Sequence, residues 1–145
     1  MTPCAYGRLL VLLQLGLLAA LLCCGPWIAK TPTLFALEVV GAALAAWAVF
    51  LMRGALRASP EPAANGTLLM RGPYRWIRHP MYAGLLLAAL ALLLERPTAA
   101  RAAAWFALLA LLLVKLRHEE RLLTAHFPGY RQYQGSTKRL IPFLY

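Results

Sequence analysis

The sequence contains no aspartate, and five glutamates are its only acidic residues. Charged residues make up 14% of the chain and hydrophobic residues 61%, whereas an ordinary soluble domain has about 25% and about 45–50%. The apolar share is too large and the charged share too small for a soluble fold. The composition therefore predicts an all-α integral membrane protein.

Patterns for metal binding and for nucleotide-binding turns are missing as well. The three cysteines, Cys4, Cys23 and Cys24, form no CxxC pair, and the three histidines offer no metal-ligand spacing. We interpret the cysteines as apolar filler of a helix and expect no metal site. The sequence also has no G-x-G-x-x-G turn, which excludes a Rossmann-type domain.

Four apolar runs are present, and a helix needs about 20 such residues, or about 30 Å, to cross a bilayer. The third run is shorter and spans only if it stands upright or the bilayer thins. We predict a single membrane domain, residues 1–145, with about four transmembrane helices and a C-terminal helical hairpin. The predicted spans are residues 9–24, 33–52, 80–95 and 98–117, joined by a polar loop at 53–79 and followed by an interfacial tail at 118–145.

Positive charge is uneven between the two faces that four spans define. Twelve Lys and Arg residues lie in the N-terminal segment, the loop and the tail, against three in the other connections, Lys30, Arg96 and Arg101. The positive-inside rule therefore places both termini, the loop and the tail in the cytosol. We expect a multi-pass protein of a bacterial inner membrane that contacts anionic lipids rather than nucleic acid.

Two polar clusters border the predicted hairpin, at residues 71–82 and 115–121, and the hairpin brings them to the same membrane depth. Pro80 suits the first position of a helix, which makes His79 a cap whose imidazole lies near free backbone N–H groups. With Arg75 and Arg78, this helix start predicts a site for an anionic group. The alternative is that the basic and aromatic residues here only anchor the helix among lipid headgroups.

Two adjacent acids, Glu119 and Glu120, lie one turn beyond the fourth apolar run. They could be local partners of Lys115 and Arg117 at a solvated helix end. Because glutamates near a helix C-terminus oppose the helix dipole, a functional role is favoured. Such carboxylates suit a cationic or hydroxyl-rich ligand, and either could act as a base for an amine nucleophile.

Residues 72–84, GPYRWIRHPMYAG, resemble the signature of the integral membrane methyltransferases, which include isoprenylcysteine carboxyl methyltransferase and phospholipid methyltransferases. Three later stretches of the chain resemble the rest of that signature. They are Glu119-Glu120, Phe127-x-Gly129-Tyr130-x-x-Tyr133 and Arg139-x-Ile141-Pro142. The resemblance covers about half of the chain, and its two separated motifs occur in the right order.

The resemblance implies an enzyme that transfers a methyl group from S-adenosylmethionine to a lipophilic or lipid-linked acceptor, such as an isoprenylcysteine carboxylate or a phospholipid amine, at the cytosolic membrane face. The acceptor would enter from the bilayer, and neither its identity nor the oligomeric state follows from the sequence. Catalytic roles would fall to Glu119, Glu120 and Arg78. The cofactor-binding residues would be Tyr74, Arg75, His79, Tyr82, Gly84, Glu119, Glu120 and Tyr130. The aromatic tail would be either a lid over the cofactor or a segment lying on lipid.

Two other functions remain open at this point. In a non-enzymatic membrane assembly subunit, both motifs would be interfacial anchors. A small transporter should carry polar or broken helices near mid-membrane, and apart from Glu38 the apolar runs contain no such feature.

The predicted orientation can be tested with reporter fusions at Tyr145 and in the loop near Ala64. Both reporters should give a cytosolic signal, because segments rich in Lys and Arg stay on the cytosolic side of the membrane. A periplasmic or lumenal signal at either position would remove both polar clusters from the compartment in which S-adenosylmethionine is made.

Overall fold

The computed structural model describes residues 3–53 and 68–142, so residues 54–67 of the predicted loop lie outside the description. The described chain is helical throughout, and its one β-bridge joins Ile77 to Lys138. The elements are α1 (Pro3–Cys23), α2 (Pro32–Leu51), the 3-10 helix η1 (Gly72–Arg75), α3 (Pro80–Glu95), α4 (Ala99–His126) and α5 (Tyr130–Ser136). Three helices, α1, α2 and α4, are long and apolar enough to cross a membrane, and α3 is a shorter apolar helix. The predicted all-α membrane fold is confirmed.

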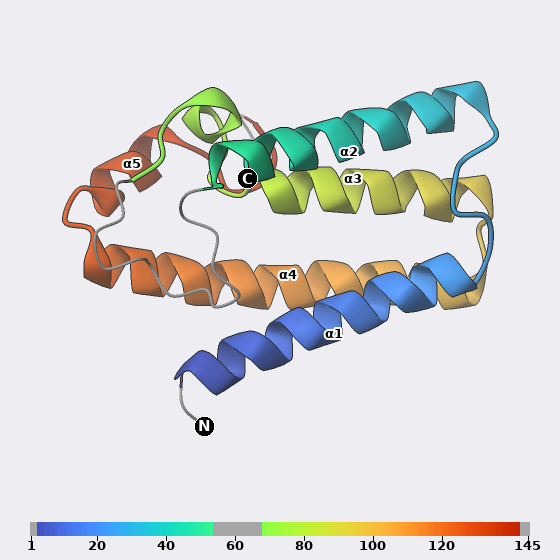
Figure 1. The fold of residues 1–145 in the computed structure, drawn as a ribbon, viewed down its shortest axis with the longest axis horizontal. Coiled ribbons are helices and arrows are strands. Elements are labelled where there is room, and N and C mark those ends of the chain that lie inside the picture. Colours follow the sequence, from blue (N-terminus) through green and yellow to red (C-terminus); the bar gives the residue numbers. More distant parts are fainter. Residues whose placement is uncertain (1–2, 54–67, 143–145) are drawn as a thin grey trace.

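The long helices pack in two pairs (Figure 1). Helix α2 lies along α3, and α1 lies along α4. A shared core of leucines and alanines from α3 and α4 joins the pairs, and Leu21 of α1 also contributes to it. The start of α3, the end of α4, η1 and α5 lie together at one end of the bundle, which we call the site end. The α1–α2 and α3–α4 connections lie at the other end, the connector end.

Small residues allow α2 and α3 to pack closely. A Cβ atom added to Gly84 of α3 would come within 2.5 Å of the Gly41 carbonyl oxygen and 2.6 Å of the Ala45 nitrogen, both on α2. A Cβ atom on Gly41 would likewise meet the backbone of Ala88 and Gly84. Helices that lack a side chain at the contact can bring their backbones together, as is common in membranes.

Three charged side chains hold the α1–α2 connection at the connector end. Glu38 accepts a hydrogen bond from the backbone N–H of Ala29 at 2.8 Å, and Glu95 accepts one from Thr31 at 3.1 Å. Arg101, which is fully buried, donates to the carbonyl oxygens of Leu92 and Pro26. Glu38, the acid inside the second apolar run, therefore binds the backbone of the α1–α2 connection in this structure.

Helix α4 continues to His126, well beyond the apolar run that ends near residue 117. Within this extension, Glu119 and Glu120 contact the start of α3 and the tail. A further short helix, α5, forms within the stretch that the sequence assigns to the tail. Both polar clusters are consequently carried on ordered elements.

Replacing Gly84 by Ala should lower the free energy of unfolding, because the added methyl group meets the backbone of α2, which cannot move aside as a side chain could. Overpacking of this kind costs about 1–3 kcal/mol. Gly16→Ala is the matched control, since nothing lies within 4 Å of a Cβ atom at Gly16. Thermal unfolding in detergent should show a lower midpoint for Gly84→Ala only, and equal midpoints would contradict the close packing of α2 on α3.

Candidate functional site

The site begins where the tail pairs with the segment that leads into α3. The backbone N–H of Arg78 donates to the Lys138 carbonyl oxygen at 2.8 Å, and that of His79 donates to Arg139 at 3.0 Å. The N–H of Lys138 in turn donates to the carbonyl oxygen of Trp76 at 3.1 Å. These bonds place residues 137–139 beside the start of α3, directly opposite the end of α4.

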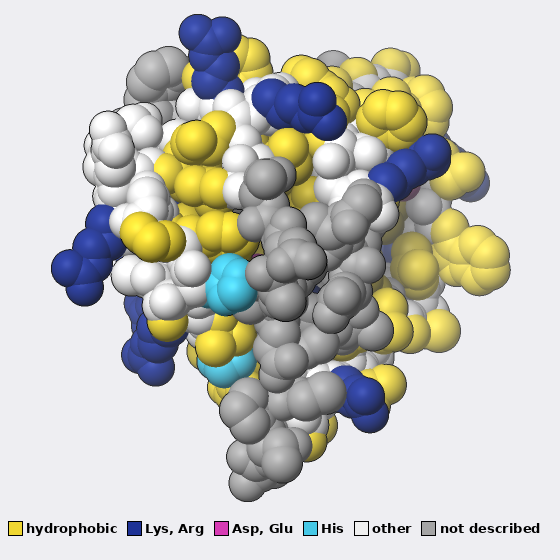
Figure 2. All heavy atoms as spheres, turned by 60° about the vertical axis from the view of Figure 1, so that its left-hand side comes forward, with side chains coloured by type: hydrophobic (Ala, Val, Ile, Leu, Met, Phe, Trp, Pro, Cys, Tyr) yellow, Lys and Arg dark blue, Asp and Glu magenta, His cyan; other side chains and the backbone are white. Residues whose placement is uncertain are grey.

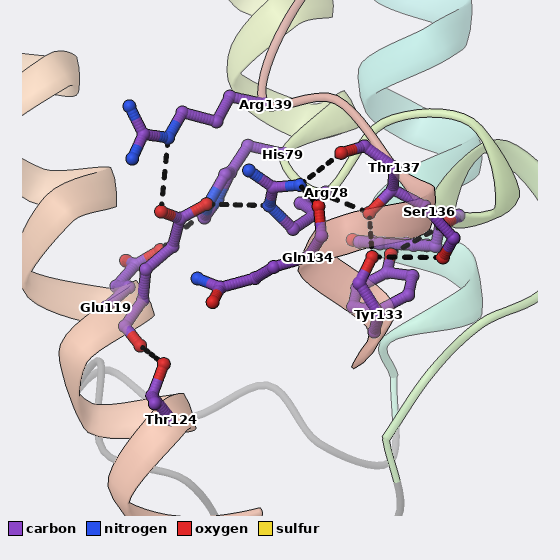
Figure 3. A network of polar contacts seen from close by, with 11 residues as sticks. Arg78, His79, Glu119, Thr124, Tyr133, Gln134, Ser136, Thr137 and Arg139 are labelled. Atoms are coloured by element: carbon purple, nitrogen blue, oxygen red, sulfur yellow. Dashed lines mark hydrogen bonds and ion pairs between the residues drawn. The ribbon is translucent and has the colours of Figure 1, made fainter. Parts of the chain in front are cut away.

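Arg78 connects the tail to α4 (Figure 3). Its Nε donates to Glu120 Oε1 at 2.7 Å, and its Nη1 donates to the Gln134 carbonyl oxygen at 3.1 Å. The same Nη1 donates to the carbonyl oxygen of Thr137 and to its Oγ1. Only 8% of the Arg78 side chain is exposed. A planar guanidinium with several fixed donors suits such a junction, whereas an ammonium would not.

Glu120 lies between two arginines. Besides the bond from Arg78, its Oε2 accepts from Arg139 Nε at 3.2 Å, and the Nε2 atom of His79 lies 3.5 Å from its Oε1. The local pairing with Arg117 considered above does not form, and Arg117 is exposed. A carboxylate balanced by two guanidinium groups is a poor proton acceptor, so Glu120 serves to tie α4 to the tail.

Glu119 makes fewer close polar contacts than Glu120 does. Its Oε1 accepts from the Tyr82 hydroxyl at 2.5 Å, and its Oε2 lies 3.7 Å from His79 Nδ1. The Glu119 side chain is 18% exposed, against 6% for Glu120. One oxygen of Glu119 therefore has no close hydrogen bond within the described chain and remains available to a ligand.

His79 faces these carboxylates, which corrects one expectation. It is the N-cap residue of α3, but its side chain makes no capping bond. Instead its carbonyl oxygen accepts from the N–H groups of Tyr82 and Ala83, and its imidazole stacks on the Tyr82 ring with 5.5 Å between centroids. Its Nε2 is buried and lacks a hydrogen-bond partner among the described residues. The imidazole is thus directed at the two acids of α4 rather than at the free N–H groups, and the anion site at the helix start stays a prediction.

Three tyrosines support the tail behind this cluster. The Tyr133 hydroxyl donates to the Tyr74 carbonyl oxygen at 2.5 Å, and the Tyr74 hydroxyl donates to Ala48 of α2 at 3.5 Å. Burial raises the pKa of Tyr133 to about 12 and raises the pKa of Tyr74 and Tyr130 as well. All three phenols consequently stay protonated at neutral pH, and those of Tyr74 and Tyr133 donate the hydrogen bonds just described.

The structure brings together most of the predicted site residues, but not all of them. Arg78, His79, Tyr82, Glu119 and Glu120 form one network, and the buried Tyr130 lies against it. The other three lie elsewhere: Gly84 packs on α2, Arg75 is exposed on η1, and Tyr74 supports the tail.

Sequence reasoning did not assign a role in the site to Gln134, Thr137 or Arg139. Arg139 could have been found, since it stands in the tail motif and is basic. Gln134 carried no signal, because Arg78 contacts its backbone carbonyl oxygen, which every residue type offers. Thr137 is contacted at its carbonyl oxygen and at its Oγ1, and a lone threonine in a polar tail gives no signal for that either. Only the folded tail identifies them.

The donor set suits one class of ligand. The cluster offers a partly free carboxylate and a histidine nitrogen that makes no hydrogen bond within the described chain, both buried or half-buried at the end of an apolar bundle. These groups can hold an ammonium group and hydroxyl groups. No group of three His, Cys, Asp or Glu residues that could hold a metal occurs in the described part of the chain.

Comparison with known proteins agrees with this chemistry. The model of the isoprenylcysteine carboxyl methyltransferase (ICMT) family matches residues 34–125, a range that includes His79, Glu119 and Glu120. The chain is also 30% identical over 125 residues to the cobalt-zinc-cadmium resistance protein CzcN of Cupriavidus metallidurans, a match that covers 83% of this chain and 53% of that protein. The chain thus spans about half the length of this curated relative.

Replacing Arg78 by Gln should release the tail, because Glu120 loses a buried partner and two carbonyl oxygens lose their donor. Removing one member of a buried ion pair costs about 3–5 kcal/mol, which corresponds to a loss of protection of about a hundred-fold or more. Hydrogen exchange of the backbone amides of residues 130–139 measures this directly. Arg75→Gln, an exposed change three residues away, should leave exchange unaltered, and equal exchange in both variants would show that Arg78 does not hold the tail.

Proposed function

Because the chain belongs to the isoprenylcysteine carboxyl methyltransferase family, we propose that it transfers a methyl group from S-adenosylmethionine to a lipophilic or lipid-linked acceptor. The family consists of membrane methyltransferases that use this cofactor. The observation that carries the proposal is the buried Glu119–His79–Glu120 cluster, built from both motif segments at one end of an apolar helical bundle.

The residues of the cluster fit the polar part of the cofactor. Glu119, held in place by the Tyr82 hydroxyl, would accept hydrogen bonds from the amino group or the ribose through its second oxygen. His79 would offer its Nε2 atom, which makes no hydrogen bond among the described residues. When bound, the cofactor supplies a sulfonium methyl, which the acceptor's lone pair takes while the electrons of the broken S–C bond return to sulfur.

The chain's own contribution to the reaction is alignment and exclusion of water. The tail, fixed by Arg78, covers the cluster from the side opposite the end of α4. A carboxylate acceptor needs no base. For an amine acceptor, Glu119 is the candidate base, since Glu120 is already neutralised by Arg78 and Arg139.

We also propose that the site end faces the cytosol. Lys and Arg side chains project around this end (Figure 2), and exposed examples are Arg75, Arg117, Arg121, Arg131 and Lys138. Basic residues of this kind favour the cytosolic interface and its anionic lipids. S-adenosylmethionine is made in the same compartment, so the cluster would have direct access to it.

His79→Asn tests the proposal, because it removes the imidazole that lies between the two carboxylates. Hydrogen bonds to charged groups contribute about 1.5–3 kcal/mol, so binding of S-adenosylhomocysteine, measured by calorimetry in detergent, should weaken about ten- to a hundred-fold. Thermal unfolding is measured alongside, because the imidazole is buried and stacks on the Tyr82 ring, and the loss of binding should appear at temperatures where the variant remains folded.

Arg117→Gln is the matched control, since Arg117 is an exposed residue of α4 near the cluster. It should bind S-adenosylhomocysteine as the parent does. A parent protein that binds neither S-adenosylmethionine nor its demethylated product would overturn the proposal and favour a non-enzymatic assembly subunit. Unchanged binding by His79→Asn would reduce the histidine to a packing residue.

A further inference from the structure

The segment before α3 and the tail form a paired unit whose inner side belongs to the site. We call residues 76–79 and 137–139 the strap, since three backbone hydrogen bonds join these two segments. On its inner side, the guanidinium group of Arg78 binds Glu120 and Thr137. Any partner that holds the outer side of the strap therefore also holds the groups that fix the tail to α4.

The outer side of the strap carries an indole ring and a cation that take no part in the site. Trp76 is 55% exposed, and Lys138 is exposed as well, as is Ile141 just beyond the strap. The side chain of Lys138 makes no ion pair within the described chain. Figure 2 shows hydrophobic side chains beside basic ones at this end of the molecule. Tryptophan together with a basic residue is typical of the region where lipid headgroups meet water.

The strap also lies close to the level at which α2 leaves the apolar layer. The Tyr74 hydroxyl of η1 donates to the carbonyl oxygen of Ala48 at 3.5 Å, so η1 packs along the last turn of α2. On that turn Phe50 is exposed, and the guanidinium carbon of Arg53 lies 4.7 Å from the centroid of its ring. Aromatic and basic side chains side by side mark the headgroup region here, and Trp76 follows Tyr74 by two residues.

We infer that the outer side of the strap is a docking surface for anionic lipid headgroups, in which Lys138 binds the lipid phosphate and the Trp76 ring lies among the headgroups. Charge complementarity selects this partner, because the chain carries 15 Lys and Arg against five acids and anionic lipids attract basic residues at the membrane surface. The docked lipid holds the strap where Arg78 reaches Glu120, so the lipid composition of the membrane regulates how firmly the tail covers the site. Only this effect on the site rests on the proposed function.

The overall positive charge of the site end makes a different forecast. If anionic lipid acts through that charge alone, every exposed basic residue at this end should contribute equally. If the strap is the docking surface, Lys138 should matter and Arg117 should not, because Arg117 is exposed on α4 outside the strap. Lys138→Gln and Arg117→Gln each remove one positive charge and therefore separate the two cases.

Hydrogen exchange in nanodiscs of two compositions tests the inference, one of phosphatidylcholine alone and one of equal parts phosphatidylcholine and phosphatidylglycerol. The amides to follow are those of Arg78, His79 and Lys138, which donate the bonds of the strap. In the parent they should exchange about five-fold more slowly in the anionic nanodiscs, as expected from one basic residue near an anionic surface. Lys138→Gln should lose this protection, whereas Lys138→Arg and Arg117→Gln should keep it. Inorganic phosphate added to phosphatidylcholine nanodiscs should not reproduce it, because a free ion brings no headgroup layer to Trp76.

Binding of S-adenosylhomocysteine, followed in the same samples, separates this inference from the proposed function. Affinity should rise with the anionic lipid in the parent but not in Lys138→Gln. Equal strap exchange in both nanodiscs, or equal losses of protection in Lys138→Gln and Arg117→Gln, would overturn the docking surface even if S-adenosylhomocysteine binds. Protection by anionic lipid without any binding of S-adenosylhomocysteine would support the docking surface and refute the methyltransferase proposal instead.

Discussion

The carboxylate of Glu120 is buried where α4, the segment before α3 and the tail meet. The arrangement of the site end depends on the groups that balance its negative charge. Arg78 comes from the segment before α3, Arg139 comes from the tail, and both bind the same carboxylate of α4. An unpaired carboxylate at this position would cost several kcal/mol, so the three segments are stable only together. The Ile77–Lys138 bridge and the bonds of Arg78 to residues 134 and 137 then fix the path of the tail.

This balance gives the two adjacent glutamates different roles. They are consecutive on α4, so their side chains point about 100° apart around the helix. Glu120 meets the arginines, while Glu119 meets Tyr82 and His79 and keeps one oxygen without a close bond. The guanidinium groups of Arg78 and Arg139 both bind Glu120. The site therefore retains a carboxylate oxygen, on Glu119, that a ligand can bind.

The fold class could be predicted because apolar runs of about 20 residues leave the backbone little choice but the helix in lipid. The meeting of His79 with Glu119 and Glu120 could be anticipated, because a short turn forces the third and fourth helices to run antiparallel. The direction of the His79 imidazole could not be anticipated, since it follows from contacts with the acids of α4 and with the Tyr82 ring that form only in the folded chain. Gly84 was assigned to the site from its place in the motif, but its lack of a side chain lets α2 pack closely against α3. The course of α4 to His126 was not predicted either, because the apolar run ends near residue 117 and the charged residues that follow resemble the end of a span.

The family match covers some of the residues at the site end and leaves others outside. Residues 34–125 include α2, α3 and both glutamates, which form the frame shared with the family. Gln14 on α1 and Arg139 in the tail lie outside that range, yet one contacts the buried Lys115 and the other contacts Glu120. The polar end of the bundle is therefore completed by residues from both sides of the matched range. The first helix is almost entirely apolar, and Gln14 is the polar side chain through which it contacts Lys115 of α4. Because a buried ammonium is costly without a hydrogen-bond acceptor, this single contact ties α1 to the polar end of the bundle.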